Sequence, residues 1–150
     1  MQIEIDQSGK VEYTSAKTAV ADSLGNSILL KAADKRNLQN KYRNFGFPRA
    51  YTVGVFSCLC ALLIKSSYSN HARYLIDTEY PGKDNEIKGS ILIFAKRLKV
   101  PLRRDQIWFG HIGKKSKAHE HAYNSFVRRK NIGCLNPGIV EKIVFEKFEK

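Results

Sequence analysis

Cysteine is scarce in this chain of 150 residues, and the 3 that occur do not form a framework. Cys58 and Cys60 are separated by one residue, whereas zinc knuckles and redox pairs usually have two residues between their cysteines, and Cys134 stands alone. This spacing argues against a disulfide scaffold and against a structural zinc site. It predicts reduced, mostly buried thiols in an intracellular protein.

The chain also lacks a long hydrophobic run. Its longest apolar stretch, residues 51–64, contains Thr52, Gly54 and Ser57 and is shorter than the roughly 20 residues that a membrane span needs. This stretch therefore predicts a buried core helix. The N-terminus begins with a strand pattern and has no charged region followed by an apolar run, as a signal peptide would have. We expect a cytoplasmic protein with no membrane partner.

Acidic residues are few, since 14 Asp and Glu stand against 26 Lys and Arg and give a formal net charge of +12. The excess is spread along the chain and is not collected in a tail. A polyanionic partner such as nucleic acid explains this balance, because each basic side chain that meets a phosphate releases counterions. The alternative is a soluble basic surface without such a partner.

With 43% hydrophobic residues, the chain is long enough for one domain with a real core and too short for two ordinary domains. It has no internal repeat, no low-complexity segment and no linker long enough to divide it. We therefore expect a single domain over residues 1–150.

Hydrophobic periodicity predicts that strands and helices alternate. Apolar alternation from Ile3 predicts a first strand, which residues 11–13 continue or follow with a second one. Gly25 and Asn26 predict a two-residue hairpin between two further strands. We expect these strands at 18–23 and 27–31, later strands at 73–77 and 107–111, and helices at 32–44, 49–66, 85–98, 116–129 and 137–149.

This order predicts an α/β fold with a mixed five-stranded sheet. The first three strands form an antiparallel meander, and strands four and five run parallel to strand one, because helical crossovers join them. Helices cover both faces of the sheet, and an extra helix ends the chain. Its apolar stripe fits either a cover for the sheet or a dimer contact.

Two aspartates become interesting in this topology. Asp6 lies in the first strand and Asp77 at the end of the fourth, so the crossover would bring their carboxylates together. Close carboxylates repel strongly in a partly dry site, and a divalent cation such as Mg²⁺ or Mn²⁺ is the usual remedy. In phosphodiester hydrolysis two such ions activate a water and stabilise the leaving oxygen. The alternative is that each aspartate only caps a turn.

Three short segments resemble motifs of the ribonuclease H family. Asp6 begins an Asp-Gln-Ser-Gly segment that is similar to the family's Asp-Gly-Ser segment in the first strand. Asp77 lies in an Ile-Asp-Thr-Glu-Tyr segment similar to the family's Thr-Asp-Ser-x-Tyr segment in the fourth strand. Gly110 begins a loop that resembles Gly-His-x-Gly, and residues 116–122 resemble the Asn-Glu-x-x-Asp-x-x-Ala helix. The match covers residues 2 to about 130 and implies a ribonuclease H-like fold.

The resemblance also implies the residues of a site. Asp6 and Asp77 would be metal-ligating carboxylates, and His119 falls where the family's last metal-binding aspartate would lie. An Asp, Asp, His set is similar to that of the Piwi branch of the same superfold, and a neutral imidazole suits Mn²⁺ better than Mg²⁺. His111 matches the loop histidine that assists product release or proton transfer. The alternative for His119 is an ordinary helix histidine.

One departure from the family concerns a metal-binding glutamate in the helix after the third strand. No acidic residue occurs here between Lys35 and Asp77. Glu79 is the first substitute, because residues two apart on a strand point to the same face, and Asp84 or Glu86 is less suitable. The alternative is that the fold persists while catalysis is lost.

Basic residues supply candidate phosphate contacts. Lys114 and Lys115 lie just before a helix N-terminus, where backbone N–H groups and the helix dipole favour an anion. Trp108 occupies the position of the first glycine of a P-loop, so we expect no nucleoside triphosphate. A second basic cluster resembles the family's duplex-binding handle, with a charge-rich solvated loop as the alternative. Its members are Lys96, Arg97, Arg103 and Arg104.

These features lead to three hypotheses. The first is a metal-dependent nuclease that hydrolyses phosphodiester bonds, with RNA or RNA/DNA hybrid favoured over DNA, by a two-metal-ion mechanism. The second is a catalytically inactive nucleic-acid-binding or assembly module of the same fold. The third is a basic protein-interaction domain. The sequence leaves the oligomeric state open.

Overall fold

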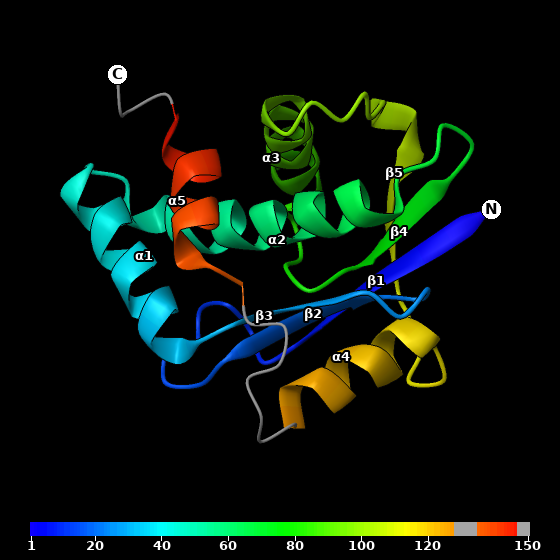
Figure 1. Cartoon of the computed structure of the whole chain (residues 1–150), viewed down its shortest axis with the longest axis horizontal. Helices are drawn as coiled ribbons and strands as arrows, with labels where there is room; N and C mark the ends of the chain where they lie inside the picture. Colours follow the sequence, from blue (N-terminus) through cyan, green and yellow to red (C-terminus); the bar gives the residue numbers. More distant parts are fainter. Residues whose placement is uncertain (128–134, 147–150) are drawn as a thin grey trace.

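The chain folds into alternating strands and helices, and the computed structural model describes residues 1–127 and 135–146 (Figure 1). The strands are β1 (Gln2–Ser8), β2 (Thr18–Asp22), β3 (Ser27–Leu30), β4 (Arg73–Asp77) and β5 (Ile107–Gly110). The α-helices are α1 (Ala32–Asn44), α2 (Tyr51–Ser67), α3 (Asp84–Arg97), α4 (Lys117–Val127) and α5 (Pro137–Phe145). Short 3-10 turns, η1 (Pro48–Ala50) and η2 (Arg104–Gln106), precede α2 and β5.

The five strands form one mixed sheet in the order β3-β2-β1-β4-β5. β1 pairs antiparallel with β2, and β2 antiparallel with β3, whereas β1 with β4 and β4 with β5 are parallel pairs. This arrangement confirms the predicted α/β class, the meander of the first three strands and the parallel fourth and fifth strands.

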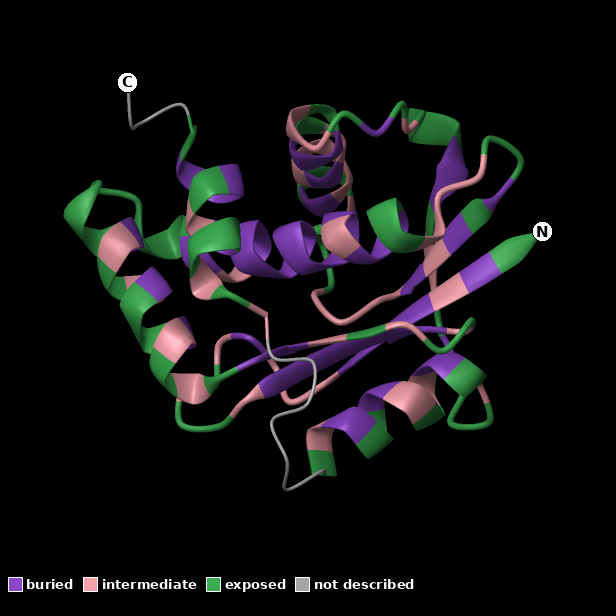
Figure 2. Ribbon diagram, viewed as in Figure 1, coloured by how far each residue is buried: buried purple, intermediate pink, exposed green. Residues whose placement is uncertain are grey.

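Helices cover both faces of the sheet (Figure 1). α2 crosses one face, and α3 and α5 pack on α2, while α4 lies on the opposite face against β1, β2 and β3. α2 is apolar on nearly all sides and is buried along most of its length (Figure 2). Within the described residues, Pro48–Ser67 is the one segment long and apolar enough to cross a membrane, but 67% of its apolar window is buried inside the protein. The predicted core helix is confirmed.

The connection from β1 to β2 is a series of turns, so the predicted strand at residues 11–13 is wrong. A buried lysine from α1 holds these turns. Lys35 Nζ donates hydrogen bonds to the carbonyl oxygens of Lys10 and Tyr13, at 3.3 and 2.7 Å, and to Thr18 Oγ1 at 2.8 Å. Burial lowers the pKa of Lys35 to about 8. Since the lysine satisfies these carbonyls, the segment does not need a neighbouring strand.

The connection from β2 to β3 also differs from the predicted two-residue hairpin. Ala21 pairs with Ser27, so the turn is longer than two residues. Asp22 Oδ1 accepts hydrogen bonds from the backbone N–H groups of Leu24 and Asn26, at 2.9 and 3.0 Å. The carboxylate replaces ladder bonds and closes the longer turn, as aspartate often does.

Some predictions fall partly outside the described residues. α4 is described to Val127, and the predicted helix end at 129 lies beyond it. α5 ends at Phe145, whereas residues 147–149 of the predicted helix, like Cys134, are outside the described ranges. Cys58 and Cys60 are buried free thiols, as expected, and burial raises the pKa of Cys58 to about 12.

Candidate functional site

The candidate site lies where the parallel strands β1 and β4 end. Ile5 pairs with Ile76, and both side chains are buried in the core. Because side chains alternate along a strand, the next residues, Asp6 and Asp77, point to the opposite face, the one on which α4 packs. The crossover therefore brings the two predicted aspartates side by side.

A third carboxylate joins them. One carboxylate oxygen each of Asp6, Asp77 and Glu79 lies within 4.8 Å of the other two, and we call these residues the acidic trio. Asp6 is buried, while Asp77 and Glu79 are half-buried. Asp84 and Glu86, the weaker substitutes for the missing helix glutamate, lie in the first turn of α3 and are not part of this group.

Glu79 is the residue whose protonation the site changes most. Its pKa is raised to about 8, mostly by burial and in addition by a hydrogen bond with Asp77 and by the charges of Asp77 and Asp6. A carboxyl held against two carboxylates keeps its proton at neutral pH because a third negative charge would be poorly stabilised there. A bound cation would remove that penalty.

Hydrogen bonds fix the orientation of both aspartates. Asp6 Oδ1 accepts from the backbone N–H of Gln7, and Asp77 Oδ1 from that of Ile112, each at 2.8 Å. His119 Nδ1 lies 2.9 Å from Asp6 Oδ2. An ionised carboxylate can only accept, so Nδ1 carries the proton and donates it. His119 thus meets the site through Asp6, and its predicted role as a direct metal ligand stays a prediction.

The loop after β5 borders the site with basic residues. His111, Lys114 and Lys115 are all exposed in it. Ser116 Oγ accepts a hydrogen bond from an N–H in the first turn of α4 and donates one to Glu4 Oε1, at 3.1 and 3.2 Å. These two bonds attach the end of the loop to β1 and to α4.

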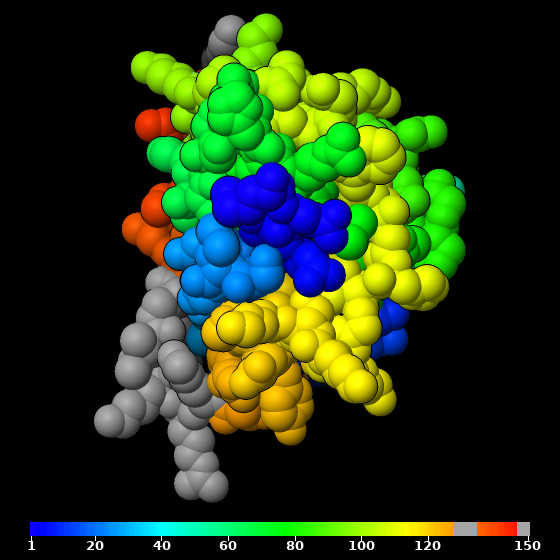
Figure 3. Space-filling view, turned by 90° about the vertical axis from the view of Figure 1, so that its right-hand side faces the viewer, coloured from blue at the N-terminus to red at the C-terminus, as the bar shows by residue number. Residues whose placement is uncertain are grey.

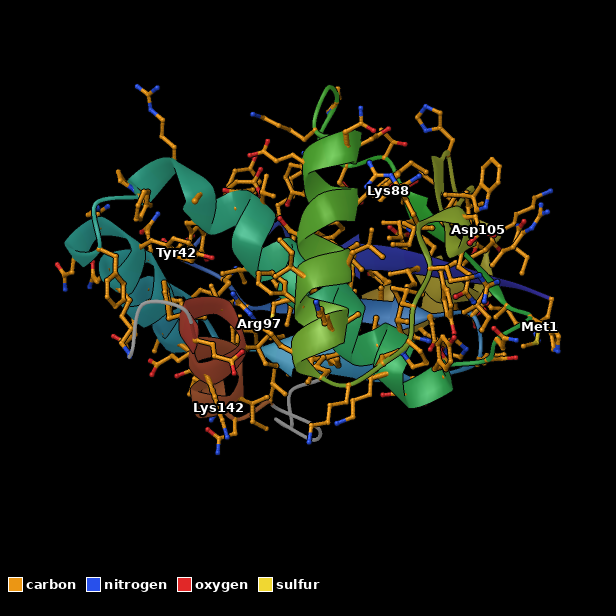
Figure 4. The ribbon with its side chains drawn as sticks, turned by 90° about the horizontal axis from the view of Figure 1, so that it is seen from above. Met1, Tyr42, Lys88, Arg97, Asp105 and Lys142 are labelled. Carbon is orange, nitrogen blue, oxygen red and sulfur yellow. The ribbon has the colours of Figure 1, made fainter. Side chains whose placement is uncertain are left out.

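The second basic cluster divides into two groups in space. Arg97 Nη1 donates to the carbonyl oxygens of Ile143 and Val144 in α5, at 2.6 and 3.2 Å, and its guanidinium pairs with Glu146. Figure 4 shows Arg97 between Tyr42 and Lys142, well away from Asp105. Arg97 anchors α5, so we leave it out of the nucleic-acid interface. The same end of α3 carries Lys96, whereas Arg103 and Arg104 lie before β5.

A polar chain on the other side of β1 escaped the sequence analysis. Gln7 Nε2 donates to Tyr80 Oη, which donates to Glu12 Oε1, each at 3.0 Å. Gln7 Oε1 is buried without a hydrogen-bond partner among the described residues. The signal was available, because Gln7 shares the core-facing side of β1 with Ile3 and Ile5. These hydrogen bonds fix the position of Tyr80, which directly follows Glu79 in the sequence.

Comparisons with protein-family models, with curated proteins and with solved structures found no match for this chain. Its site is therefore interpreted from geometry and chemistry alone.

Proposed function

We propose that this protein is a metal-dependent nuclease of ribonuclease H-like fold that hydrolyses phosphodiester bonds in nucleic acid, with RNA or RNA/DNA hybrid favoured. The observation that carries the proposal is the convergence of Asp6, Asp77 and Glu79, with ligand atoms within 4.8 Å of one another. The strand order β3-β2-β1-β4-β5 and the net charge of +12 support it.

The donor set suits a hard divalent cation. Carboxylate oxygens are the ligands that Mg²⁺ and Mn²⁺ prefer, and Asp6, Asp77 and Glu79 would hold the ion. The raised pKa of Glu79 supports the same conclusion, since burial and the two aspartates disfavour a third negative charge that a bound cation would stabilise. When bound, such a cation supplies activation of water and stabilisation of the leaving oxygen.

The chain's own groups prepare the site for that chemistry. The N–H groups of Gln7 and Ile112, together with His119, hold the aspartates in place, so little reorganisation is needed when a substrate binds. Lys114 and Lys115 attract the phosphate backbone from the adjoining loop. His111, exposed in the same loop, is available to transfer a proton to the leaving oxygen or to assist product release.

A cleavage assay with site variants tests the proposal. Labelled RNA/DNA hybrid, duplex RNA and single strands are incubated with Mg²⁺ or Mn²⁺ and with wild type, Asp77→Asn, Glu79→Gln or the control Asp84→Asn. We expect cleavage to require the metal and to fall by at least about a hundredfold in Asp77→Asn, because outer-shell changes alone cost up to that much. The control should stay within about twofold of wild type. Equal residual cleavage in wild type and Asp77→Asn would overturn the proposal.

The second candidate is a nucleic-acid-binding module that has lost the reaction. It is favoured by the absence of any acidic residue between Lys35 and Asp77, because the resemblance implies a metal-binding glutamate in the helix after the third strand. In that case the protein binds nucleic acid in a salt-sensitive way without metal-dependent cleavage. Salt-sensitive binding of nucleic acid, together with no metal-dependent cleavage in the assay above, would identify this second candidate.

A further inference from the structure

Next to the acidic trio, part of the α4 face of the sheet is not covered by any helix of the described residues. α4 packs over β1, β2 and β3, while on β4 and β5 the side chains of Arg73 and Trp108 are exposed. Trp108 is the only tryptophan in the chain, and 50% of its surface is exposed. Figure 3 shows this end of the molecule, with the blue start of β1 between green and yellow segments and the orange α4 below. An exposed aromatic ring is a surface on which an unpaired base can stack.

The strand register connects Trp108 to the acidic trio. Trp108 pairs with Leu75, and Gly110 pairs with Asp77. Residues two apart on a strand point to the same face, so Trp108 lies on the face of Asp77, about 7 Å back toward the N-terminal ends of the parallel strands. Gly110 carries no side chain, and a Cβ there would meet only Leu75, at 3.4 Å. Between Trp108 and Asp77 this face therefore carries the half-buried Leu75 side chain and no side chain from position 110.

The indole ring is held in a fixed position. Trp108 Nε1 donates to the carbonyl oxygen of Asp105 at 3.0 Å, so its polar edge is satisfied by the protein. The Arg73 guanidinium lies 5.4 Å from the ring centroid. Arg103 is partly neutralised by its pair with Asp105 at 3.1 Å, whereas Arg104 is exposed. An aromatic platform with neighbouring cations is the combination that stacks bases and contacts phosphates.

We propose that this face, from Trp108 and Arg73 to the acidic trio, binds an unpaired strand of nucleic acid. One base stacks on the exposed part of the Trp108 ring, and a neighbouring phosphate lies beside the Arg73 guanidinium. The statement that the bound nucleic acid is also cleaved rests on the proposed function. Its binding does not, because stacking and phosphate contacts need neither a metal nor a reaction.

A single strand fits this surface better than a duplex or a protein partner. In a duplex each base is already stacked between its neighbours, so none is free to lie on Trp108, whereas unpaired bases stack on aromatic side chains without regard to sequence. The positive charge beside the ring complements a phosphate backbone. Because Trp108 and Asp77 lie on the same face of the sheet, a single strand of nucleic acid bound at Trp108 can extend to Asp77.

The test measures binding without catalysis. A fluorescently labelled 12-nucleotide uridine strand and a hairpin duplex are titrated in EDTA, with anisotropy as the readout. We expect wild type to bind the strand more tightly than the hairpin, and Trp108→Ala to weaken strand binding by about tenfold or more. Trp108→Phe should keep most of the affinity. Arg73→Gln should lower the slope of log affinity against log salt by about one.

A matched control is Tyr123→Ala, which removes an aromatic side chain of similar exposure, 54%, from α4. Its affinity should stay within about twofold of wild type, and circular dichroism verifies that each variant is folded. Unchanged affinity in Trp108→Ala, or preference for the hairpin, would overturn the inference. So would a wild-type dimer that becomes monomeric in Trp108→Ala, because the face would then be an interface between copies. Asp77→Asn removes a negative charge at the end of this face and should bind the strand at least as tightly as wild type, so a loss of cleavage with intact binding concerns the nuclease proposal alone.

Discussion

Glu79 offers the sharpest prediction, namely that neutralising it stabilises the protein at alkaline pH. Its pKa rises from 4.5 to about 8 on folding, so the unfolded chain releases this proton more readily than the folded one. A carboxyl with a raised pKa disfavours folding once the pH exceeds 4.5, and the cost grows until about pH 8. Glu79→Gln carries no charge in either state and escapes that cost.

The magnitude follows from the size of the change in pKa. About 3.5 units between 4.5 and 8 correspond to an upper limit of about 5 kcal/mol, at about 1.4 kcal/mol for each unit. Because Glu79 and Asp77 are only half-buried, screening by solvent reduces this value to about 2 kcal/mol. We therefore expect Glu79→Gln to exceed wild type in free energy of unfolding by about 2 kcal/mol at pH 9 and by much less at pH 5.

Urea unfolding followed by tryptophan fluorescence measures this difference, in EDTA at pH 5, 7 and 9. The control is Glu120→Gln, the same chemical change at an exposed position of α4. Its effect should stay within about 0.5 kcal/mol and should not grow with pH. Added Mn²⁺ should stabilise wild type more than Glu79→Gln. Parallel pH profiles of wild type and Glu79→Gln would refute the idea that burial and the two aspartates keep Glu79 protonated.

Two further predictions concern packing. Gly54→Ala places a methyl group onto the hydroxyl of Tyr42 and should lower the free energy of unfolding by about 2 kcal/mol or more. Gly89→Ala, which has open space around it in α3, should raise it by about 0.5 to 1 kcal/mol. Thermal unfolding compares the two variants, and equal changes in their unfolding midpoints would contradict the packing around Gly54. Lys35→Met leaves the carbonyls of Lys10 and Tyr13 without their donor and should lower the free energy of unfolding by about 2 kcal/mol at pH 7. The loss should be larger at pH 10, because folded wild type has then released the Lys35 proton and no longer buries a charge. Urea unfolding at pH 7 and pH 10 measures both losses, and a smaller loss at pH 10 would contradict this reasoning.

The sequence was sufficient for the sheet because its signals are periodic. Alternation at Ile3 and Ile5 identifies β1, and the handedness of the crossover then places β4 beside it. The proximity of Asp6 and Asp77 follows from these two steps. The same alternation predicted Glu79 on the face of Asp77. In the structure Glu79 lies beyond the end of β4, and its carboxylate is close to both aspartates.

The connections could not be predicted because side chains with no periodic signal determine them. Lys35 reaches carbonyls more than twenty residues earlier in the chain, and Asp22 closes its own turn. The basic cluster separates because the chain reverses at Lys99, a non-glycine residue with φ of 61°. Arg97 precedes that reversal and turns to α5, whereas Arg103 follows it and lies near β5.

The parallel pairing of β1 with β4 also determines when during folding the site can exist. Gln2 pairs with Arg73, so the pairing closes a loop of about seventy residues, at an entropic cost of about 4 kcal/mol. Contacts so distant in sequence form slowly compared with the local meander of β1, β2 and β3. In a chain that has folded only its first three strands, Asp6 is in place but Asp77 and Glu79 are not yet beside it. Metal affinity would therefore report completed folding, and a cation bound to the acidic trio would slow unfolding by holding the two strands together.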